Sequence, residues 1–431
     1  MTAHTSGIGR PAPSLLTWPR EHSNLDDVRN YTARRIFKLA AMLTTPICQM
    51  HKSYFMPLII PYLYPKSPFN TVRKTIEYTK ALLLLIGGSL PTLMGIGLRG
   101  LACSIQEHPW TYVRGTSQGK MTLSNDEQGR KYLKLLTWNI CGLETGHAIG
   151  SGGVMPWKEI VSDGKNRIDK VITALKEEQW DVICLQETLS TDVAEYIITQ
   201  FEGEFAECYF NIAPGACKVN SGLMVISRFR IENPEFRKFR SDELAPGISH
   251  QGSNKGCFAF DVCTTTGKIA TIFTSHFGHS RIPDKAANTT PEQIRLREEE
   301  ENGRGRQLKA TLEMMSQDRS TCPKILTGDL NDNEEGLSES LQRILEGDKN
   351  KKSLIDYWNR LKKGTGRSDG EFSWGGEGLF SPVASGPVNL DHTWVLNATI
   401  KTILNNTGYK PDQFNIEATS DHRGLFSHVY I

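Results

Sequence analysis

Polar and ionisable side chains stand at the ends of apolar, strand-like runs along the C-terminal part of this 431-residue chain. Glu187, for example, follows the run VICLQ, and Asp329 follows KILTG. One such residue means little, because polar groups commonly cap strands. Six clusters predict that several strands bring their polar ends to one edge of a sheet. The clusters are Asn139, Glu187, His276, Asp329 with Asn331, Asp391 with His392, and Asp421 with His422.

Short apolar runs alternate with helical patterns in this part of the chain, which predicts an α/β domain. Residues 132–140 and 221–227 are strand-like, whereas residues 165–178 carry apolar side chains at helical spacing. The runs 257–263 and 269–275 flank turn residues and predict paired strands. Interleaved strands, helices and hairpins indicate two packed sheets flanked by helices.

Composition divides the chain into three parts. Residues 1–110 predict a helical, partly apolar region, residues 111–131 a polar linker, and residues 132–431 the catalytic α/β domain. The chain up to about Arg130 is mildly basic, although the whole chain has a net charge of only +2. This balance is unlike that of a dedicated polyanion-binding protein.

Residues 81–98 are the candidate for membrane association. They lack charged side chains and lie between Lys80 and Arg99. Their length is close to the minimum of about 18 residues for a helix that crosses a bilayer. Glycines and Pro91 reduce their hydrophobicity. A transmembrane helix, an interfacial segment and a buried hairpin all remain open.

The cellular location is left open by the sequence. We expect no signal peptide, because the first residues lack an apolar core and a cleavage site. The nine cysteines show no C-x-x-C spacing, which argues against zinc. Their odd number favours a reducing compartment for the catalytic domain. Both an enzyme anchored to a membrane and an internal enzyme fit these features.

Seven segments, taken in order, resemble the endonuclease/exonuclease/phosphatase superfamily, which includes DNase I-like nucleases and neutral sphingomyelinases. They are LLTWNI (135–140), LQET (185–188), SGLMVIS (221–227), TSHFG (274–278), GDLND (328–332), LDHTWV (390–395) and TSDHRGLF (419–426). Each motif alone is weak, but their order makes the resemblance specific. It implies a four-layer α/β sandwich and magnesium-dependent hydrolysis of phosphoric esters.

The resemblance implies metal binding by three residues. Glu187 corresponds to the main ligand of a hard divalent cation, with Asn139 beside it and Asp421 nearby. Carboxylate and amide oxygens suit Mg²⁺, and Mn²⁺ fits the same oxygens. His392 stands where the family usually has an aromatic residue, and we interpret it as structural.

The resemblance also implies catalytic roles. Asp329 corresponds to the residue that activates water, and Asn331 to one that orients the water or the phosphate. His276 corresponds to a donor to a nonbridging phosphate oxygen, and Asp391 to the acid that orients His422. Hydrolysis of a phosphoester needs an activated water, relief of phosphoryl charge and a stabilised leaving group. These residue types supply those needs.

Several substrates remain open. The apolar segment 81–98 and the absence of a strong basic stripe favour a phospholipid, as for a sphingomyelinase. A nuclease or nucleic-acid end-processing enzyme needs several Lys and Arg contacts to phosphates. Candidates for such contacts are residues 349–352, Arg360, Lys362, Lys363 and Arg367. A soluble phosphorylated metabolite is the third possibility. SGPVNLDHTW (385–394) lacks the Trp-Cys-Asp-Arg core of the inositol-polyphosphate 5-phosphatases, which argues against that branch.

A membrane-anchored binding protein that kept the fold but lost catalysis is the alternative from another class. Such proteins usually lose a metal-binding or water-activating residue, whereas this chain has them all. We therefore expect an enzyme that acts on a phosphoester substrate, and no sequence feature identifies a protein partner.

Overall fold

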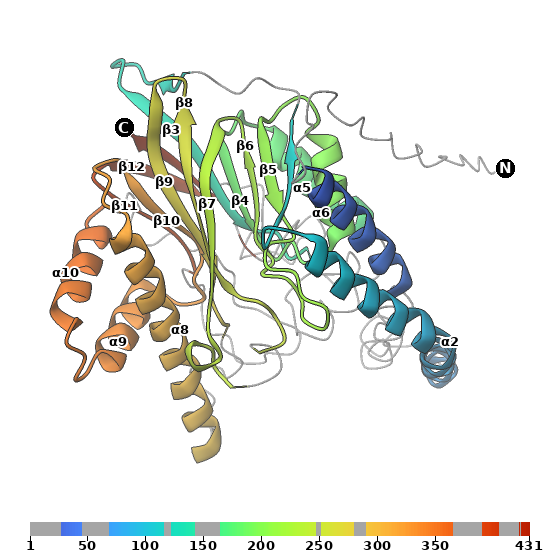
Figure 1. Cartoon of the computed structure of the whole chain (residues 1–431). Coiled ribbons are helices and arrows are strands. Elements are labelled where there is room, and N and C mark those ends of the chain that lie inside the picture. Colours follow the sequence, from blue (N-terminus) through green and yellow to red (C-terminus); the bar gives the residue numbers. More distant parts are fainter. Residues whose placement is uncertain are drawn as a thin grey trace.

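The computed structural model describes residues 27–44, 69–115, 122–142, 164–246, 251–279, 290–364, 390–404, 422 and 424–431. Two β-sheets pack face to face within these ranges, and helices cover the outer face of each sheet (Figure 1). The predicted four-layer α/β sandwich is therefore confirmed.

The first sheet has the strand order β1-β5-β6-β4-β3-β13-β12, and β2 pairs with β3. Its strands are β1 (Thr111–Arg114), β2 (Ser124–Asn125), β3 (Lys131–Asn139), β4 (Val182–Gln186), β5 (Glu207–Phe210), β6 (Met224–Ser227), β12 (Thr399–Leu404) and β13 (Leu425–Tyr430). Strands β3 and β4 are parallel, and Asn139 pairs with Gln186. Their carboxyl ends therefore meet at one edge of the sheet.

The second sheet has the order β11-β10-β9-β8-β7. Its strands are β7 (Arg230–Lys238), β8 (Gly256–Thr264), β9 (Gly267–His276), β10 (Lys324–Asp329) and β11 (Asp391–Leu396). Asp329 pairs with His276 on the parallel strand β9 and with Asp391 on the antiparallel strand β11. We call the edge at which Asn139, Gln186, His276 and Asp329 end their strands the polar edge.

The sandwich is held together by alternating side chains. On β3, Leu135 packs between the two sheets and Leu136 packs toward the outer helices, because successive side chains of a strand point to opposite faces. Helices α5 (Gly164–Lys176) and α6 (Thr191–Gln200) cover the first sheet. Helices α8 (Pro291–Gln317), α9 (Glu334–Ile344) and α10 (Lys351–Lys362) cover the second. This packing fixes the strand ends that form the polar edge.

Among the described residues, two helices precede the sandwich and contact it. Residues 27–44 form the first helix, whose Arg34 makes a bidentate ion pair with Glu195 of α6. The second, α2 (Asn70–Ile105), packs against the first where Gly95 meets Ala40. Gly95 is required there, because an added Cβ would lie 2.9 Å from the Ala40 carbonyl oxygen.

The segment predicted as a linker, 111–131, instead contributes β1 and β2 to the first sheet. β1 pairs with β5 over four residues, from Thr111 opposite Phe210 to Arg114 opposite Glu207. Its sequence, TYVR, is too short to show a strand pattern. This segment is a strand because it pairs with β5. The predicted limits of the catalytic domain, 132–431, stay a prediction.

Candidate active site

Asp329 is the centre of the polar edge. Its side chain is 1% exposed, and its Oδ2 accepts a hydrogen bond from Asn139 Nδ2 at 2.8 Å. The same oxygen lies 3.7 Å from His276 Nε2 and 3.8 Å from His422 Nε2. Both sheets thus bring three other predicted residues to one buried carboxylate.

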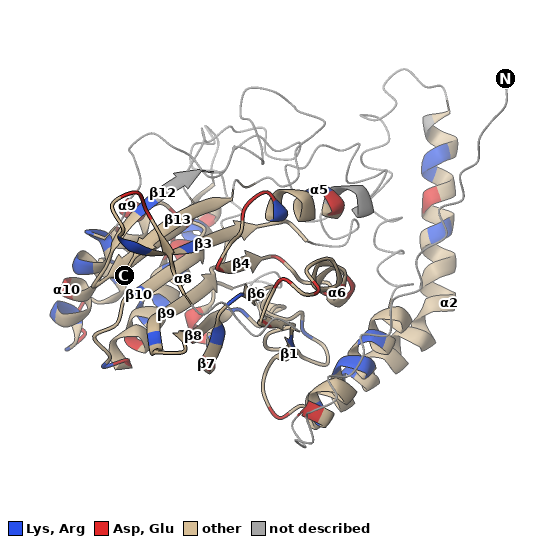
Figure 2. Ribbon diagram, turned by 90° about the horizontal axis from the view of Figure 1, so that it is seen from above, with Lys and Arg blue, Asp and Glu red and all other residues tan. Residues whose placement is uncertain are grey.

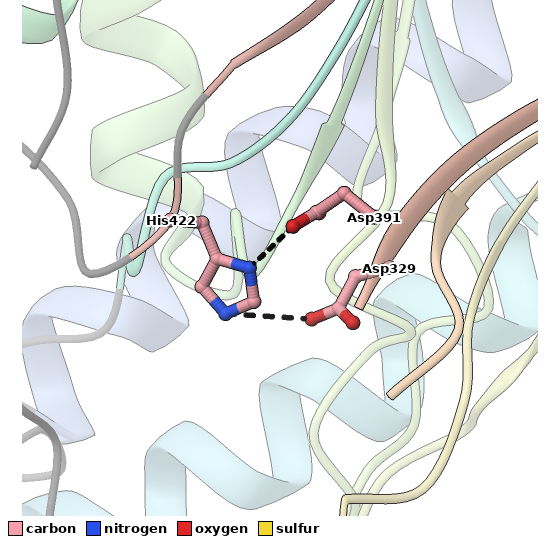
Figure 3. A group of neighbouring side chains, drawn as sticks. All are labelled: Asp329, Asp391 and His422. Carbon is pink, nitrogen blue, oxygen red and sulfur yellow. Dashed lines mark hydrogen bonds and ion pairs between the residues drawn. The ribbon is translucent and has the colours of Figure 1, made fainter. Parts of the chain in front are cut away.

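His422 is oriented by Asp391, as Figure 3 shows. Its Nδ1 lies 2.7 Å from Asp391 Oδ2, and both side chains are buried. Trp138 Nε1 also donates a hydrogen bond to the His422 carbonyl oxygen at 3.0 Å, which fixes the backbone. The Nδ1–H group donates a hydrogen bond to the Asp391 carboxylate, and the other ring nitrogen, Nε2, faces Asp329. The predicted acid–imidazole arrangement is therefore present in the structure.

Glu187 and Asn139 lie side by side in the first sheet. Asn139 pairs with Gln186, so Glu187 follows directly at the same edge. Its carboxylate is 23% exposed, and Oε1 is 3.9 Å from His276 Nε2. Glu187 has a φ of +59°, a left-handed conformation that is uncommon for this residue type and is frequent at functional sites. Asp421, the third predicted metal ligand, lies outside the described residues.

The GDLND turn holds Asn331 against Asp329. The Asn331 backbone N–H donates to Asp329 Oδ1 at 3.0 Å, and Asn331 Nδ2 donates to the Phe277 carbonyl oxygen at 3.0 Å. Gly328 has a φ of +137°, and a Cβ there would lie 2.0 Å from the Ser275 carbonyl oxygen. Only glycine fits this position, which explains its place before the aspartate.

A sequence model of the endonuclease/exonuclease/phosphatase family matches residues 136–422, which is more than half of the chain. The chain belongs to this family. Members of the endonuclease/exonuclease/phosphatase family are metal-dependent phosphoric ester hydrolases. The matched range begins in β3 and ends at His422, so it includes every residue of the polar edge named above.

Comparison of structures shows the same fold. The crystal structure of SmcL gives a TM-score of 0.50 at 14% identity, covering 69% of this chain and 99% of that chain. Sphingomyelinase C from Streptomyces griseocarneus gives 0.46 at 15%, covering 69% and 99%. Truncated TDP2 from Caenorhabditis elegans gives 0.44 at 16%, covering 70% and 98%. At 14% identity, the likeness to SmcL shows the fold alone. No curated protein sequence matches the chain.

Three residues at the polar edge also have the spacing of a metal site. Ligand atoms of Asp329, Asp391 and His422 all lie within 4.8 Å of one another. His422 Nδ1, however, is already bonded to Asp391. Hard cations such as Mg²⁺ prefer oxygen ligands to imidazole. The Asp391–His422 contact therefore accounts for two of the three ligand atoms in this group.

Burial shifts the pKa values of the central groups toward neutral forms. Burial raises the pKa of Asp329 to about 7, although the nearby His422 opposes the shift. Burial also holds the pKa of His276 well below its usual value, and the charge of Lys255 adds to this effect. A carboxyl group with a pKa near neutrality is suited to proton transfer at physiological pH.

Lys255 is a site residue that the sequence analysis missed. It is 5% exposed, and its Nζ donates hydrogen bonds to the carbonyl oxygens of Phe277 at 2.7 Å and His276 at 3.5 Å. Burial lowers its pKa to about 8, while the carboxylates of Glu187 and Asp329 oppose the shift. The predicted β8–β9 hairpin contained a signal for this position. Lys255 comes just before the first strand of the hairpin, so it lies beside His276, which ends the second strand.

Lys255→Met is expected to lower kcat about 10- to 100-fold, because a buried positive charge beside the carboxylates is lost. A lysine with a pKa of about 8 loses its charge as the pH rises through that value. Activity of the natural protein should therefore fall above about pH 8, and Lys255→Met should lack this decline. The measurement is kcat as a function of pH. An unchanged alkaline decline in Lys255→Met would contradict this role.

His392 packs at the side of the site, in contact with an aromatic ring and a backbone carbonyl group. Its ring stacks on Trp394 with ring centroids 4.2 Å apart. Its Nε2 lies 2.8 Å from the Asp332 carbonyl oxygen, at the end of the GDLND turn. The imidazole thus ties β11 to this turn, next to Asp391 but turned away from Asp329.

Proposed function

We propose that this chain is a divalent-metal-dependent phosphodiesterase in which Asp329 activates a water molecule for attack on phosphorus. The observation that carries the proposal is the convergence on buried Asp329 of Asn139, His276 and the His422–Asp391 couple. This arrangement gathers a proton acceptor and several hydrogen-bond donors around one point, as phosphoester hydrolysis requires.

Each of these residues has a proposed step. Asp329 accepts the proton of the attacking water, and Asn331, which is bonded to Asp329, orients that water or the phosphate. His276 is neutral and donates to a nonbridging phosphate oxygen. Asp391 stabilises the protonated His422, whose Nε2–H donates to the phosphoryl group as charge builds.

Glu187 and Asn139 are proposed to hold Mg²⁺, together with Asp421. Their carboxylate and amide oxygens sit at adjacent strand ends, and the partial exposure of Glu187 lets a hydrated ion approach. This donor set suits a hard cation, and Mn²⁺ fits it as well. When bound, such a cation offsets the negative charge of the phosphoryl oxygens.

Glu187→Gln is expected to raise the Mg²⁺ concentration for half-maximal activity about 10- to 100-fold, because one charged ligand oxygen becomes neutral. The measurement is activity during a Mg²⁺ titration, with calorimetric titration of the metal as a second readout. Glu202→Gln, at an exposed position after α6, is the control and should behave as the natural protein. An unchanged metal requirement in Glu187→Gln would place the ion elsewhere.

A phospholipid is the proposed substrate. Residues Thr71–Ile105 of α2 are long and apolar enough to cross a membrane, and their most apolar 18-residue window has a mean hydropathy of 1.9. Only 17% of the most apolar window is buried against the rest of the protein. A water-exposed apolar helix of this kind supports membrane association, and an enzyme held at a membrane meets phospholipid headgroups.

Nucleic acid is the alternative substrate. Arg360 of α10 is one of the candidate phosphate contacts, and the structure shows where it lies. Tyr357 donates to the Met315 carbonyl oxygen, which also accepts from Lys324 at the start of β10. Arg360 lies beside the same tyrosine, with its Cζ 5.5 Å from the centroid of the Tyr357 ring. Asp329, at the other end of β10, is on the order of 16 Å away. Arg360 therefore lies on the side away from the polar edge, which argues against it as a phosphate contact there.

The test compares sphingomyelin vesicles with plasmid DNA, using the full-length protein in Mg²⁺, in EDTA, and as Asp329→Asn. We expect phosphocholine release that requires both the metal and Asp329. DNA nicking with the same requirements would instead support the nucleic-acid alternative. If neither substrate reacts, a smaller phosphoester or a non-catalytic, membrane-anchored binding protein becomes the better account.

A further inference from the structure

The end of α2 is bound to a loop of the catalytic sandwich. Arg99 donates from Nε to the Gly215 carbonyl oxygen at 3.1 Å and from a guanidinium nitrogen to the Lys218 carbonyl oxygen at 3.0 Å. We call residues 211–222, which connect β5 to β6, the docking loop. Gly100 of α2 also packs against Ala216 of this loop. The helix is therefore fixed to the sandwich at one place by both polar and apolar contacts.

The docking loop lies beside the proposed metal ligand. The Thr188 backbone N–H donates to the Gly222 carbonyl oxygen at 2.9 Å, and Asn220 Nδ2 donates to the Leu189 carbonyl oxygen at 3.2 Å. A Cβ added at Gly222 would lie 3.3 Å from the Glu187 Cα atom, so the two backbones are in close contact. The loop thus joins the end of α2 to the polar edge at Glu187.

The rest of α2 has the dimensions of a bilayer segment. Lys80 and Arg99 bracket its uncharged part and lie about 28 Å apart along the helix, close to the roughly 30 Å of a hydrocarbon core. Figure 1 shows this part running away from both sheets, and Figure 2 shows it free of charge. Its exposed large apolar side chains are Leu82, Leu83, Leu85, Ile86, Leu90, Leu93 and Met94.

A second helix extends beyond the polar edge. Arg304 of α8 donates to Asp332 at 2.9 Å, so this part of α8 is level with the end of β10. The helix begins at Pro291, about 20 Å further along its axis. Figure 1 shows this end free of the sheets, on the same lower side as the free end of α2. The apolar side chains of Ile294 and Leu296 are 48% and 37% exposed there.

Two lysines add positive charge at the same edge. Lys218 is exposed in the docking loop, and Lys238 is exposed at the end of β7, where it pairs with Gly256 beside Lys255. Burial lowers the pKa of Lys238, and the positive charge of Lys218 adds to this shift. Phosphate groups of a lipid surface complement this pair.

We propose that α2 enters a lipid bilayer and that its bonds to the docking loop hold the polar edge facing that membrane, with the tip of α8 as a second contact. The substrate is then a phosphodiester in the headgroup layer of the same membrane, in place of one that diffuses in solution. The proposal rests on the proposed function for its chemistry, whereas the orientation is independent of turnover.

The exposed thiol of Cys217, in the docking loop, allows a direct test. Cys48, Cys103 and Cys322 are changed to Ser, the five buried cysteines are kept, and a fluorophore is attached at position 217. The full-length protein is placed in phosphatidylcholine vesicles that contain a headgroup quencher. We expect a loss of fluorescence at position 217. As the matched control, the label is moved with Cys217→Ser and Thr266→Cys to the β8–β9 turn, which is at the opposite edge.

The control label lies about 30 Å from the polar edge, the length of β9, and should keep its fluorescence. Equal quenching at both positions, or the absence of vesicle binding, overturns the proposed orientation. Quenching at position 217 that persists in Asp329→Asn, together with no hydrolysis by the natural protein, supports the orientation and refutes the proposed function.

The role of α2 is tested with the double variant Leu83→Lys and Ile86→Lys, at positions that are 64% and 68% exposed. Charges at mid-helix oppose bilayer entry, so we expect the loss of co-flotation with vesicles and of quenching at position 217. Hydrolysis of the soluble phosphodiester bis(4-nitrophenyl) phosphate should stay unchanged. The control is the double variant Leu83→Ile and Ile86→Leu, which should bind vesicles. Vesicle binding that survives the lysines overturns entry through α2.

Discussion

Asp329→Asn is expected to lower kcat by about 10²- to 10⁴-fold, the range associated with loss of a general base. Asn keeps the size of the side chain and can still accept the hydrogen bond from Asn139, but it cannot take a proton from water. The measurement is turnover of the reacting phosphoester at saturating Mg²⁺. Asp356→Asn, at an exposed position of α10, is the control and should retain full activity.

The same substitution separates catalysis from stability. Burial raises the pKa of Asp329 to about 7, whereas an unfolded aspartate has a pKa of about 3.9. Between these values the folded metal-free protein binds more protons than the unfolded chain, so its stability falls as the pH rises from about 4 to 7. Asn does not ionise and avoids this loss. At pH 8, metal-free Asp329→Asn should unfold at a temperature no lower than the natural protein does, and a marked decrease would indicate a structural role instead.

Asp391→Asn is expected to lower kcat by about 10²- to 10⁴-fold as well. The carboxylate accepts from His422 Nδ1 at 2.7 Å, and an amide in its place no longer stabilises the protonated ring or fixes its tautomer. The measurement is kcat together with its pH dependence, in which the group assigned to His422 should move to lower pH. Activity close to that of the natural protein would show that Asp391 does not act through His422.

His392→Phe is the matched control for this variant, because position 392 is the next residue of β11. An aromatic ring can keep the stacking on Trp394, but the contact to the Asp332 carbonyl oxygen at 2.8 Å is lost. We expect a loss of stability of about 1 kcal/mol and nearly full activity. A large loss of activity in His392→Phe would show that activity depends on any change in β11, so the loss in Asp391→Asn could not be assigned to the carboxylate.

The polar edge could be predicted because strand ends are a local property of the sequence. Glu187 and Asp329 each follow a short apolar run, and the family motifs place the runs in order. The structure adds that the ends belong to two sheets, with Asn139 and Glu187 in one and Asp329 and His276 in the other. Their meeting depends on the packing of β3 against β10 through the core between the sheets, which no local pattern encodes.

The features that could not be predicted depend on contacts between distant residues. β1 is a strand because Thr111 and its neighbours pair with β5, almost one hundred residues away in sequence. Lys255 precedes an apolar run, as many exposed lysines do, and only the β8–β9 register buries it beside His276. The attachment of α2 through Arg99 to the docking loop is likewise a tertiary contact. For these three features, the residues near them in sequence do not indicate the structure that the distant contacts produce.

The most direct test of the account is hydrolysis of sphingomyelin vesicles in water enriched in ¹⁸O, followed by mass spectrometry of the released phosphocholine. We predict one ¹⁸O atom in each phosphocholine molecule, because the oxygen of water replaces the ceramide oxygen on phosphorus, and no release in EDTA or with Asp329→Asn. Release that survives both EDTA and Asp329→Asn, phosphocholine without ¹⁸O, or no release under any of these conditions would contradict the account.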